Sequence, residues 1–446
     1  MRRVDCLIVG CGAAGLSAGI EFIENRSEEE ECLIIGSQLT NSSLSPWNMR
    51  IPDRDTIEEK MIQGGDGLGS ENLRNTYLDN YSDAKKFMER IGLSFEESNL
   101  GIIPEEEQSA LRKFHSYYEE ELEGEIQDQK VQNLLLNDKN EIIGVRTQEE
   151  DFLAEKLVLA AGGMTNLFEY SSGFQSKSLA NILALSLDAG LEVDNLEFMM
   201  YHPFLVVDEK LPNALISGKI LQNARFLNED GEEFLSDEIQ KALRNNNHHD
   251  KFSKMTREFY RESMRSDLAV DISEIDEERF EKFKKENEYG WVFRGKKLEE
   301  VEQFKINPTF HYSLGGLVTD ENSETSQENV FAVGEIATGL HGSNRIGGTA
   351  IPEAVIFGRI AGEEAAQRDT DRDLNVEGTA GNSEITDDLR ERFWDNLGPV
   401  RKRSEVKSLV KGLEDEDSLT SEEKLLLETG KSVLGRQKNI GSHYIE

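Results

Sequence analysis

The sequence predicts an α/β fold that opens with a nucleotide-binding unit and is interrupted by a second domain. Three observations predict it. The stretch DCLIVGCGAAGLSAGIEFIE, residues 5–24, reads as a buried strand, a glycine-rich turn and a helix. A second apolar strand, ECLIIG, follows at the distance expected of a βαβ unit. A later apolar strand of this core ends only near residue 335, so another domain must be inserted before it.

The turn after the first strand carries the spacing G-x-G-x-x-G. Gly10 allows the tight turn, Gly12 lets the backbone approach a pyrophosphate, and Gly15 allows close packing of helix on strand. The helix that begins here, at Ala13 and Ala14, points backbone N–H groups at the phosphates. With a strand before it and a helix after it, this motif predicts a dinucleotide site.

The end of the second strand favours FAD over NAD. An NAD site places a carboxylate there for the ribose hydroxyl groups. This chain has Gly36 and Ser37 instead. A serine hydroxyl still serves a flavin nucleotide, whereas an NAD site loses more, so the predicted cofactor is FAD with Ser37 among its contacts.

Two later strands complete the predicted cofactor site. EKLVLAAGG, residues 155–163, ends in small residues where chain and cofactor approach closely, which makes Ala161 and Gly162 candidate contacts. ENVFAVGEIATGLHG, residues 328–342, is another buried strand, and Glu335 stands at its end.

The charge of the chain limits its partners. It has 87 acidic and 50 basic residues and a formal net charge of −37, which opposes binding to nucleic acid or to an anionic membrane. The acids are scattered, as on a solvated surface, and a halophilic cytoplasm is the simplest setting for them. No apolar run approaches the ~20 residues that cross a bilayer, so no direct membrane insertion is expected.

The cysteines predict neither a disulfide framework nor a metal centre. Cys6, Cys11 and Cys32 are too few and wrongly spaced for a zinc site or an iron–sulfur cluster. Reduced thiols of a cytoplasmic protein fit them best.

Several stretches in one order resemble a known family. They are the glycine motif, NLEFMMYHPF (195–204), HYSLGG (311–316), the pair Gly334-Glu335, and HGSNRIGGTAIPEAVIFGRIAG (341–362). Together they are similar to the flavoprotein subunit of succinate dehydrogenase and fumarate reductase, and to L-aspartate oxidase. The resemblance covers most of residues 1–365, and the GGTA after Arg345 is more like the fumarate reductase branch.

The resemblance implies a domain organisation. It predicts a Rossmann-like FAD-binding domain at residues 1–212 and 303–373, an inserted α+β capping domain at 213–302, and a linker with a C-terminal helical region at 374–446. It also implies a separate electron-carrier protein, such as an iron–sulfur protein, through which the chain would lie peripheral to a membrane.

The resemblance also predicts that FAD is bound non-covalently. Many respiratory members link the flavin to a histidine in the segment matching TNSSLSPWNMRI, residues 40–51. This chain has no histidine there, and Ser43 is nearest. The helix after the HG-x-NR stretch is expected to face the cofactor with its first residues, Ala350 and Ile351.

A dicarboxylate beside a flavin needs donors at both of its ends. Arg345, on the glycine-rich turn, would clamp one carboxylate with His311 beside it, and His202 would bind the other. The family uses an arginine of the capping domain as the acid that protonates the substrate. The segment KMTREFYRES, residues 254–263, matches and offers Arg257.

The choice of Arg257 leaves alternatives open, because Arg261 and Arg265 lie one and two turns further on. The chain also departs from the family at two positions. Phe204 replaces a substrate-binding threonine, and Gln222 replaces a glutamate that relays protons.

Three functions therefore remain open. The first is interconversion of succinate and fumarate. The second is L-aspartate oxidase, which needs an extra carboxylate for the substrate ammonium group, with residues 105–107 as candidates. The third is a flavin-binding protein with impaired catalysis, suggested by Phe204 and Gln222.

Overall fold

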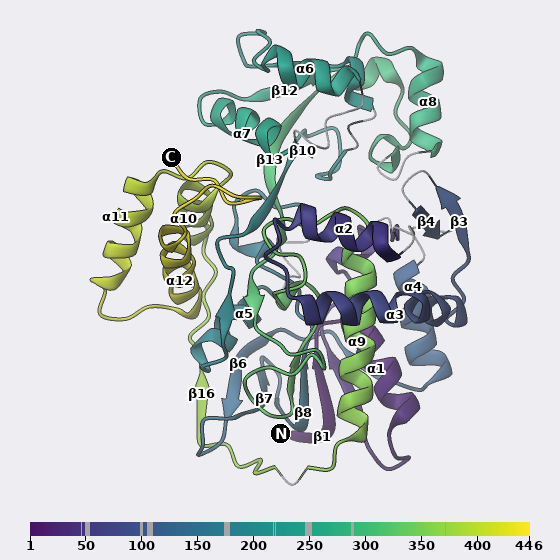
Figure 1. Ribbon diagram of the computed structural model, residues 1–446, viewed down its shortest axis with the longest axis vertical. Helices are drawn as coiled ribbons and strands as arrows, with labels where there is room; N and C mark the ends of the chain where they lie inside the picture. The colour runs from purple at the N-terminus through teal and green to yellow at the C-terminus, as the bar shows by residue number, and fades with distance from the viewer. Residues whose placement is uncertain are drawn as a thin grey trace.

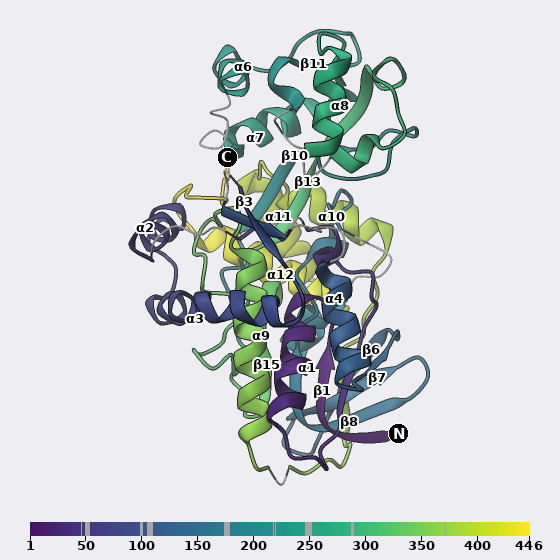
Figure 2. The same cartoon turned by 90° about the vertical axis from the view of Figure 1, so that its right-hand side faces the viewer.

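A large mixed sheet forms the body of the molecule, and a second sheet rises above it (Figures 1 and 2). The computed structural model describes residues 1–45, 47–49, 54–98, 101–104, 110–173, 179–216, 218, 220–245, 252–286, 290–370 and 372–446. Residues 105–107 and the histidines 248 and 249 lie outside these ranges. The described residues form an α/β fold in which parallel pairing dominates the core of the large sheet.

The large sheet has the strand order β16-β6-β7-β8-β1-β2-β5, and β15 pairs with β8. Its strands are β1 (Arg2–Val9), β2 (Cys32–Ile35), β5 (Glu125–Gln127), β6 (Val131–Leu136), β7 (Ile142–Thr147), β8 (Asp151–Leu159), β15 (Val330–Ala332) and β16 (Gly378–Ala380). β1 is parallel to both β2 and β8, with Cys6 opposite Cys32 and Lys156.

The apolar run of β1 is explained by helices on both faces of the sheet. Leu7 and Val9 join one hydrophobic cluster, while Cys6 and Ile8 join another on the opposite face. This alternation follows from the two-residue period of a strand. The helices of the body are α1 (Ala13–Asn25), α2 (Arg54–Gly64), α3 (Glu71–Arg90), α4 (Ala110–Ser116), α5 (Asn181–Asp188) and α9 (Ala350–Gln367).

Helices α1 and α9 lie side by side on one face of the sheet (Figures 1 and 2). Two glycines of α9, one turn apart, make the close approach possible. A Cβ on Gly358 would stand 2.4 Å from the Ala14 carbonyl oxygen, and one on Gly362 would stand 2.2 Å from that of Ala18. The packing fixes the start of α9 next to the start of α1.

The upper part is built on the sheet β10-β13-β12-β11. Its elements are β10 (Met199–Val206), β11 (Arg225–Leu227), β12 (Leu268–Asp271), β13 (Gln303–Ser313), α6 (Asp237–Arg244), α7 (Phe252–Ser263) and α8 (Glu277–Glu286). Short two-stranded pairs lie elsewhere: β3 (Phe95–Ser98) with β4 (Gly101–Pro104), and β9 (Val193–Asp194) with β14 (Gly316–Leu317). We call the part from β10 to β13 the cap.

The hydrophobic core of the cap extends beyond residues 213–302. It takes in Phe204 from β10 and Ile306 from β13, because these two long strands run from the body into the cap (Figure 1). The Phe204 ring packs against Phe226 and Phe259, with ring centroids 5.9 and 5.5 Å away.

The C-terminal helices α10 (Asp387–Leu397), α11 (Arg403–Glu414) and α12 (Ser421–Gly435) pack beside the body (Figure 1). The segment before them is more ordered than its polar sequence suggests, because β16 pairs antiparallel with β6 at the edge of the large sheet. Within the described ranges, no helix is long and apolar enough to cross a membrane.

The buried Phe204 ring predicts a stability effect. The variant Phe204→Ala leaves a cavity among aromatic rings, so we expect the free energy of unfolding to fall by about 3–5 kcal/mol. Denaturant unfolding followed by circular dichroism measures this loss. The control Met264→Ala removes a side chain that is 54% exposed and should change stability by less than ~0.5 kcal/mol. Equal stabilities of the two variants would contradict this packing.

Candidate functional site

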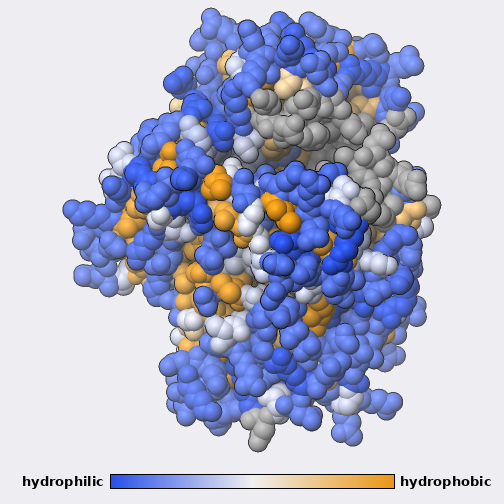
Figure 3. Space-filling model, in the orientation of Figure 1, coloured by the Kyte–Doolittle hydropathy of each residue, from blue (hydrophilic) through white to orange (hydrophobic). Residues whose placement is uncertain are grey.

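A cavity of about 1140 Å³ lies where the cap meets the body. Figure 3 shows the outer surface on one side of the molecule, where hydrophilic residues predominate and apolar residues are scattered between them. The cavity brings together most of the predicted site residues. Those that line it are Gly10, Gly12, Ala13, Ala14, Ser37, Ala161, Gly162, His202, Arg257, His311, Glu335, Arg345, Ala350 and Ile351.

The first glycine turn is as tight as the motif requires. Gly10 has φ of 121°, and a Cβ there would stand 2.1 Å from the Ala160 carbonyl oxygen. A Cβ on Gly15 would stand 1.9 Å from the Gly10 carbonyl oxygen. Gly15 is not among the cavity-lining residues and lies where α1 packs on the strand.

Two helices begin at the cavity wall without a side-chain cap. Gly12 precedes α1 and Thr349 precedes α9, and neither side chain accepts a hydrogen bond from the first turn. Free N–H groups at a helix start attract anions. The Ala13 N–H meets the Ser42 hydroxyl at 3.1 Å, and the buried Thr40 hydroxyl oxygen beside it has no hydrogen-bond partner among the described residues. This wall suits a phosphate-bearing cofactor.

Ser43 lies outside the cavity, in contrast to its predicted role. It is exposed, and its hydroxyl donates to the Thr40 carbonyl within the short turn Asn41–Ser43. Ser42 and Asn41 line the cavity instead. Adjacent serines are equivalent in the sequence, and only the turn decides which one faces inward.

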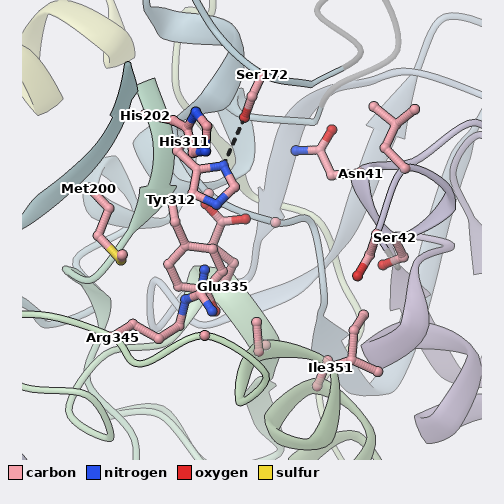
Figure 4. Close-up of a pocket in the computed structure, with 18 of the residues that line it drawn as sticks. Asn41, Ser42, Ser172, Met200, His202, His311, Tyr312, Glu335, Arg345 and Ile351 are labelled. Atoms are coloured by element: carbon pink, nitrogen blue, oxygen red, sulfur yellow. Dashed lines mark hydrogen bonds between the residues drawn. The ribbon is translucent and has the colours of Figure 1, made fainter. Parts of the chain in front are cut away.

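Two imidazoles stand on neighbouring strands at one side of the cavity, opposite Asn41 and Ser42 (Figure 4). His202 on β10 and His311 on β13 have ring centroids 5.6 Å apart. The His202 Nδ1 accepts the Phe204 N–H at 3.2 Å, so its proton resides on Nε2.

His311 is neutral at physiological pH. Its Nδ1 lies 3.1 Å from the Ser172 hydroxyl oxygen. Burial, and then the positive charge of Arg345, lower the pKa of His311 to about 3. A neutral imidazole serves here as a hydrogen-bonding group rather than as a second cation.

Arg345 is held by an aromatic ring. Its guanidinium carbon lies 4.3 Å from the centroid of the Tyr312 ring, and its Nε is buried without a hydrogen-bond partner in the described part of the chain. The Tyr312 hydroxyl donates to Glu353 at 2.9 Å, and the same carboxylate oxygen lies 2.8 Å from His341 Nε2. His341 therefore orders the platform beneath Arg345 and does not line the cavity itself.

Arg257 is held in the same manner. Its guanidinium carbon lies 4.4 Å from the centroid of the Tyr444 ring, and burial lowers the pKa of Arg257. Of the three candidate arginines, it is the one that lines the cavity in the described part of the chain. Arg261 pairs with Glu446 outside it, and the exposed Arg265 lies near Glu262.

The cavity has the opposite charge balance to the chain as a whole. Among the described lining residues, the cations are Lys60, Arg257 and Arg345, and the one carboxylic acid is Glu335. No carboxylate within the described ranges forms an ion pair with Arg257 or Arg345. In a chain with a net charge of −37, such cations mark a site for an anion.

The two departures from the family lie away from the cavity. Phe204 belongs to the cap core, and Gln222 accepts a hydrogen bond from Arg279 at 3.1 Å. Neither residue lines the cavity.

A sequence model of the family described as FAD binding domain matches residues 111–351, more than half of the chain. The chain belongs to this family. FAD is its cofactor, and it is related to FAD-dependent oxidoreductases.

Relatives with full-length similarity carry two kinds of name. A polypeptide of the fumarate reductase (CoM/CoB) of Methanothermobacter marburgensis is 23% identical, and the alignment covers 100% of this chain and 94% of the relative. L-aspartate oxidase of Pyrococcus horikoshii is 25% identical, with 100% and 96% covered. A solved structure of E. coli quinol fumarate reductase shares the fold at 18% identity, with a TM-score of 0.76, covering 100% of this chain and 92% of that one.

The environment of Glu335 predicts a pH effect on stability. Its Oε1 accepts the Ser313 N–H at 2.9 Å, yet burial raises the pKa of this carboxyl from 4.5 to about 7. The folded chain thus keeps a proton that the unfolded chain releases between these values. The resulting stabilisation is complete below about pH 4.5 and is lost as the pH rises through 7.

The FAD-loaded variant Glu335→Gln should therefore be more stable than the parent protein at pH 8, by about 1–3 kcal/mol. The difference should shrink toward pH 4.5. Denaturant unfolding at a series of pH values measures it. A difference that does not vary with pH would contradict the raised pKa.

Proposed function

We propose that the protein is an FAD-dependent oxidoreductase that interconverts succinate and fumarate. The observation that carries the proposal is the pair of guanidinium groups, Arg257 and Arg345, which face one cavity without a carboxylate partner among the described residues. A dicarboxylate supplies two negative charges to such a site.

The cofactor would be held by the glycine turn and by the two uncapped helix starts. The first turn of α1, after Gly12, suits the pyrophosphate, and Ser37 suits a ribose hydroxyl. The first turn of α9, at Ala350 and Ile351, suits the flavin ring. Bound FAD supplies the acceptor and donor of hydride.

We expect the cofactor to be bound without a covalent link. The described residues that line the cavity from the segment 40–51 are the apolar, hydroxyl and amide side chains Thr40, Asn41, Ser42, Leu44, Ser45 and Asn48. None of these is a histidine, the residue that would form the expected link.

The substrate would be held by residues from three elements. Arg345 and His311 would bind one carboxylate, since Arg345 presents a planar set of donors and His311 stands on the same wall (Figure 4). His202 would donate from Nε2 to the other carboxylate.

Arg257 would supply the proton in fumarate reduction. Burial lowers the pKa of its guanidinium, and no carboxylate in the described part of the chain neutralises it. A closed cap also excludes water, which strengthens these interactions. In the opposite direction the same group would accept the proton.

L-aspartate is the second candidate substrate, because relatives of similar identity carry that name. Its ammonium group needs a carboxylate. The one acid among the described lining residues is Glu335, and this side chain is hydrogen-bonded to the backbone at Ser313. This favours the dicarboxylate without an amino group. A separate electron-carrier protein would exchange electrons with the flavin.

Anaerobic spectroscopy of the purified, FAD-loaded protein tests the proposal. Succinate should bleach the flavin absorbance, and fumarate should reoxidise protein that has been reduced by dithionite. Bleaching by L-aspartate but not by succinate would assign the second function. Failure of both compounds would contradict the proposal and support a flavin-binding protein with impaired catalysis.

The variant Arg257→Gln provides the matched control. It should still bind FAD, because Arg257 belongs to the cap, yet it should lower dye-coupled fumarate reduction at least 100-fold. The variant Arg261→Gln changes the next arginine of the same helix and should retain turnover within about threefold. Full fumarate reduction by Arg257→Gln would remove this residue from the role of acid.

A further inference from the structure

The residues from Ile440 to Glu446, here called the C-terminal segment, lie between the body, the C-terminal helices and the cap (Figure 1). Toward the body, the Ser442 N–H and the Ser442 hydroxyl both donate to the Ser343 carbonyl, at 3.0 and 2.8 Å. Ser343 stands two residues before Arg345. The segment is therefore tied to the loop that carries the first substrate-facing arginine.

The C-terminal helices fix the same segment. The Arg403 N–H donates to the Glu446 carbonyl at 2.9 Å, and the Glu446 N–H donates to the Arg401 carbonyl at 2.7 Å. The guanidinium of the buried Arg401 donates to Nδ1 of the buried His443 at 3.0 Å. These contacts hold the residue between them, Tyr444, in a fixed place.

Toward the cap, the segment presents one aromatic ring to two arginines of α7. The guanidinium carbons of Arg257 and Arg261 lie 4.4 and 5.8 Å from the Tyr444 ring centroid. Arg261 also donates to the Tyr444 hydroxyl at 3.4 Å and to the Glu446 carboxylate at 2.5 Å. Arg261 thus has a carboxylate partner, whereas Arg257 has the ring.

We propose that Tyr444 is a positioning residue that holds the Arg257 guanidinium at the cavity wall. A carboxylate in its place would neutralise the cation and compete with an anionic substrate. An aromatic face stabilises a guanidinium while leaving its N–H groups free for the cavity. Since Ser442 binds the Ser343 carbonyl, the segment also sets the position of Arg257 relative to Arg345.

The effect on turnover rests on the proposed function, and a pair of variants tests it. Tyr444→Phe keeps the ring and should retain kcat for fumarate reduction within about threefold. Tyr444→Leu removes the ring and should lower kcat at least tenfold, with KM changed less than threefold, because the arginines and imidazoles that bind substrate remain. Equal activity of the two variants, whether both high or both low, would overturn the proposal.

Hydrogen exchange separates failure of this inference from failure of the proposed function. It is measured on the full-length, FAD-loaded protein without substrate. Amides of α7 should exchange faster in Tyr444→Leu than in Tyr444→Phe, while amides of β1 should be unchanged in both. If the parent protein does not reduce fumarate, the proposed function fails and this comparison alone decides. Equal exchange of α7 in the two variants would then overturn the positioning role.

Discussion

Two guanidinium groups without carboxylate partners among the described residues dominate the chemistry of this molecule. Arg257 and Arg345 line one cavity of a chain whose net charge is −37. Each stacks on a tyrosine ring, and each ring is held by a hydrogen bond of its hydroxyl, to Glu353 or to Arg261. Partly buried cations are costly unless an anion joins them. We infer that the site is completed by an anionic substrate.

The fold explains how these groups converge. The parallel core and the packing of α1 on α9 bring two helix starts to the cofactor side of the cavity. The long strands β10 and β13 run from the body into the cap and carry the two histidines, whose ring centroids lie 5.6 Å apart. Arg345 comes from the body and Arg257 from the cap. A movement of the cap would therefore change the distance between them, which is suited to binding and release.

Local patterns predicted much of the cofactor side, because the glycines, the buried strands and the helix starts follow from short stretches such as residues 5–24. They did not distinguish Ser42 from Ser43, since a single turn decides which hydroxyl faces inward. Tyr312 and Tyr444 were also missed as arginine platforms. Tyr444 lies 187 positions from Arg257, and no local pattern connects such distant residues. The cap boundaries depend on where β10 and β13 leave the body, which also requires the fold.

Calorimetric binding of succinate to the FAD-loaded protein tests the central claim most directly, with monomethyl succinate and dimethyl succinate as comparators. The account predicts that affinity falls with each carboxylate that is esterified, and that Arg257→Gln and Arg345→Gln each weaken succinate binding about tenfold or more. It also predicts weaker binding as salt is added. Equal affinity for succinate and its dimethyl ester, or succinate binding that neither variant weakens, would contradict it.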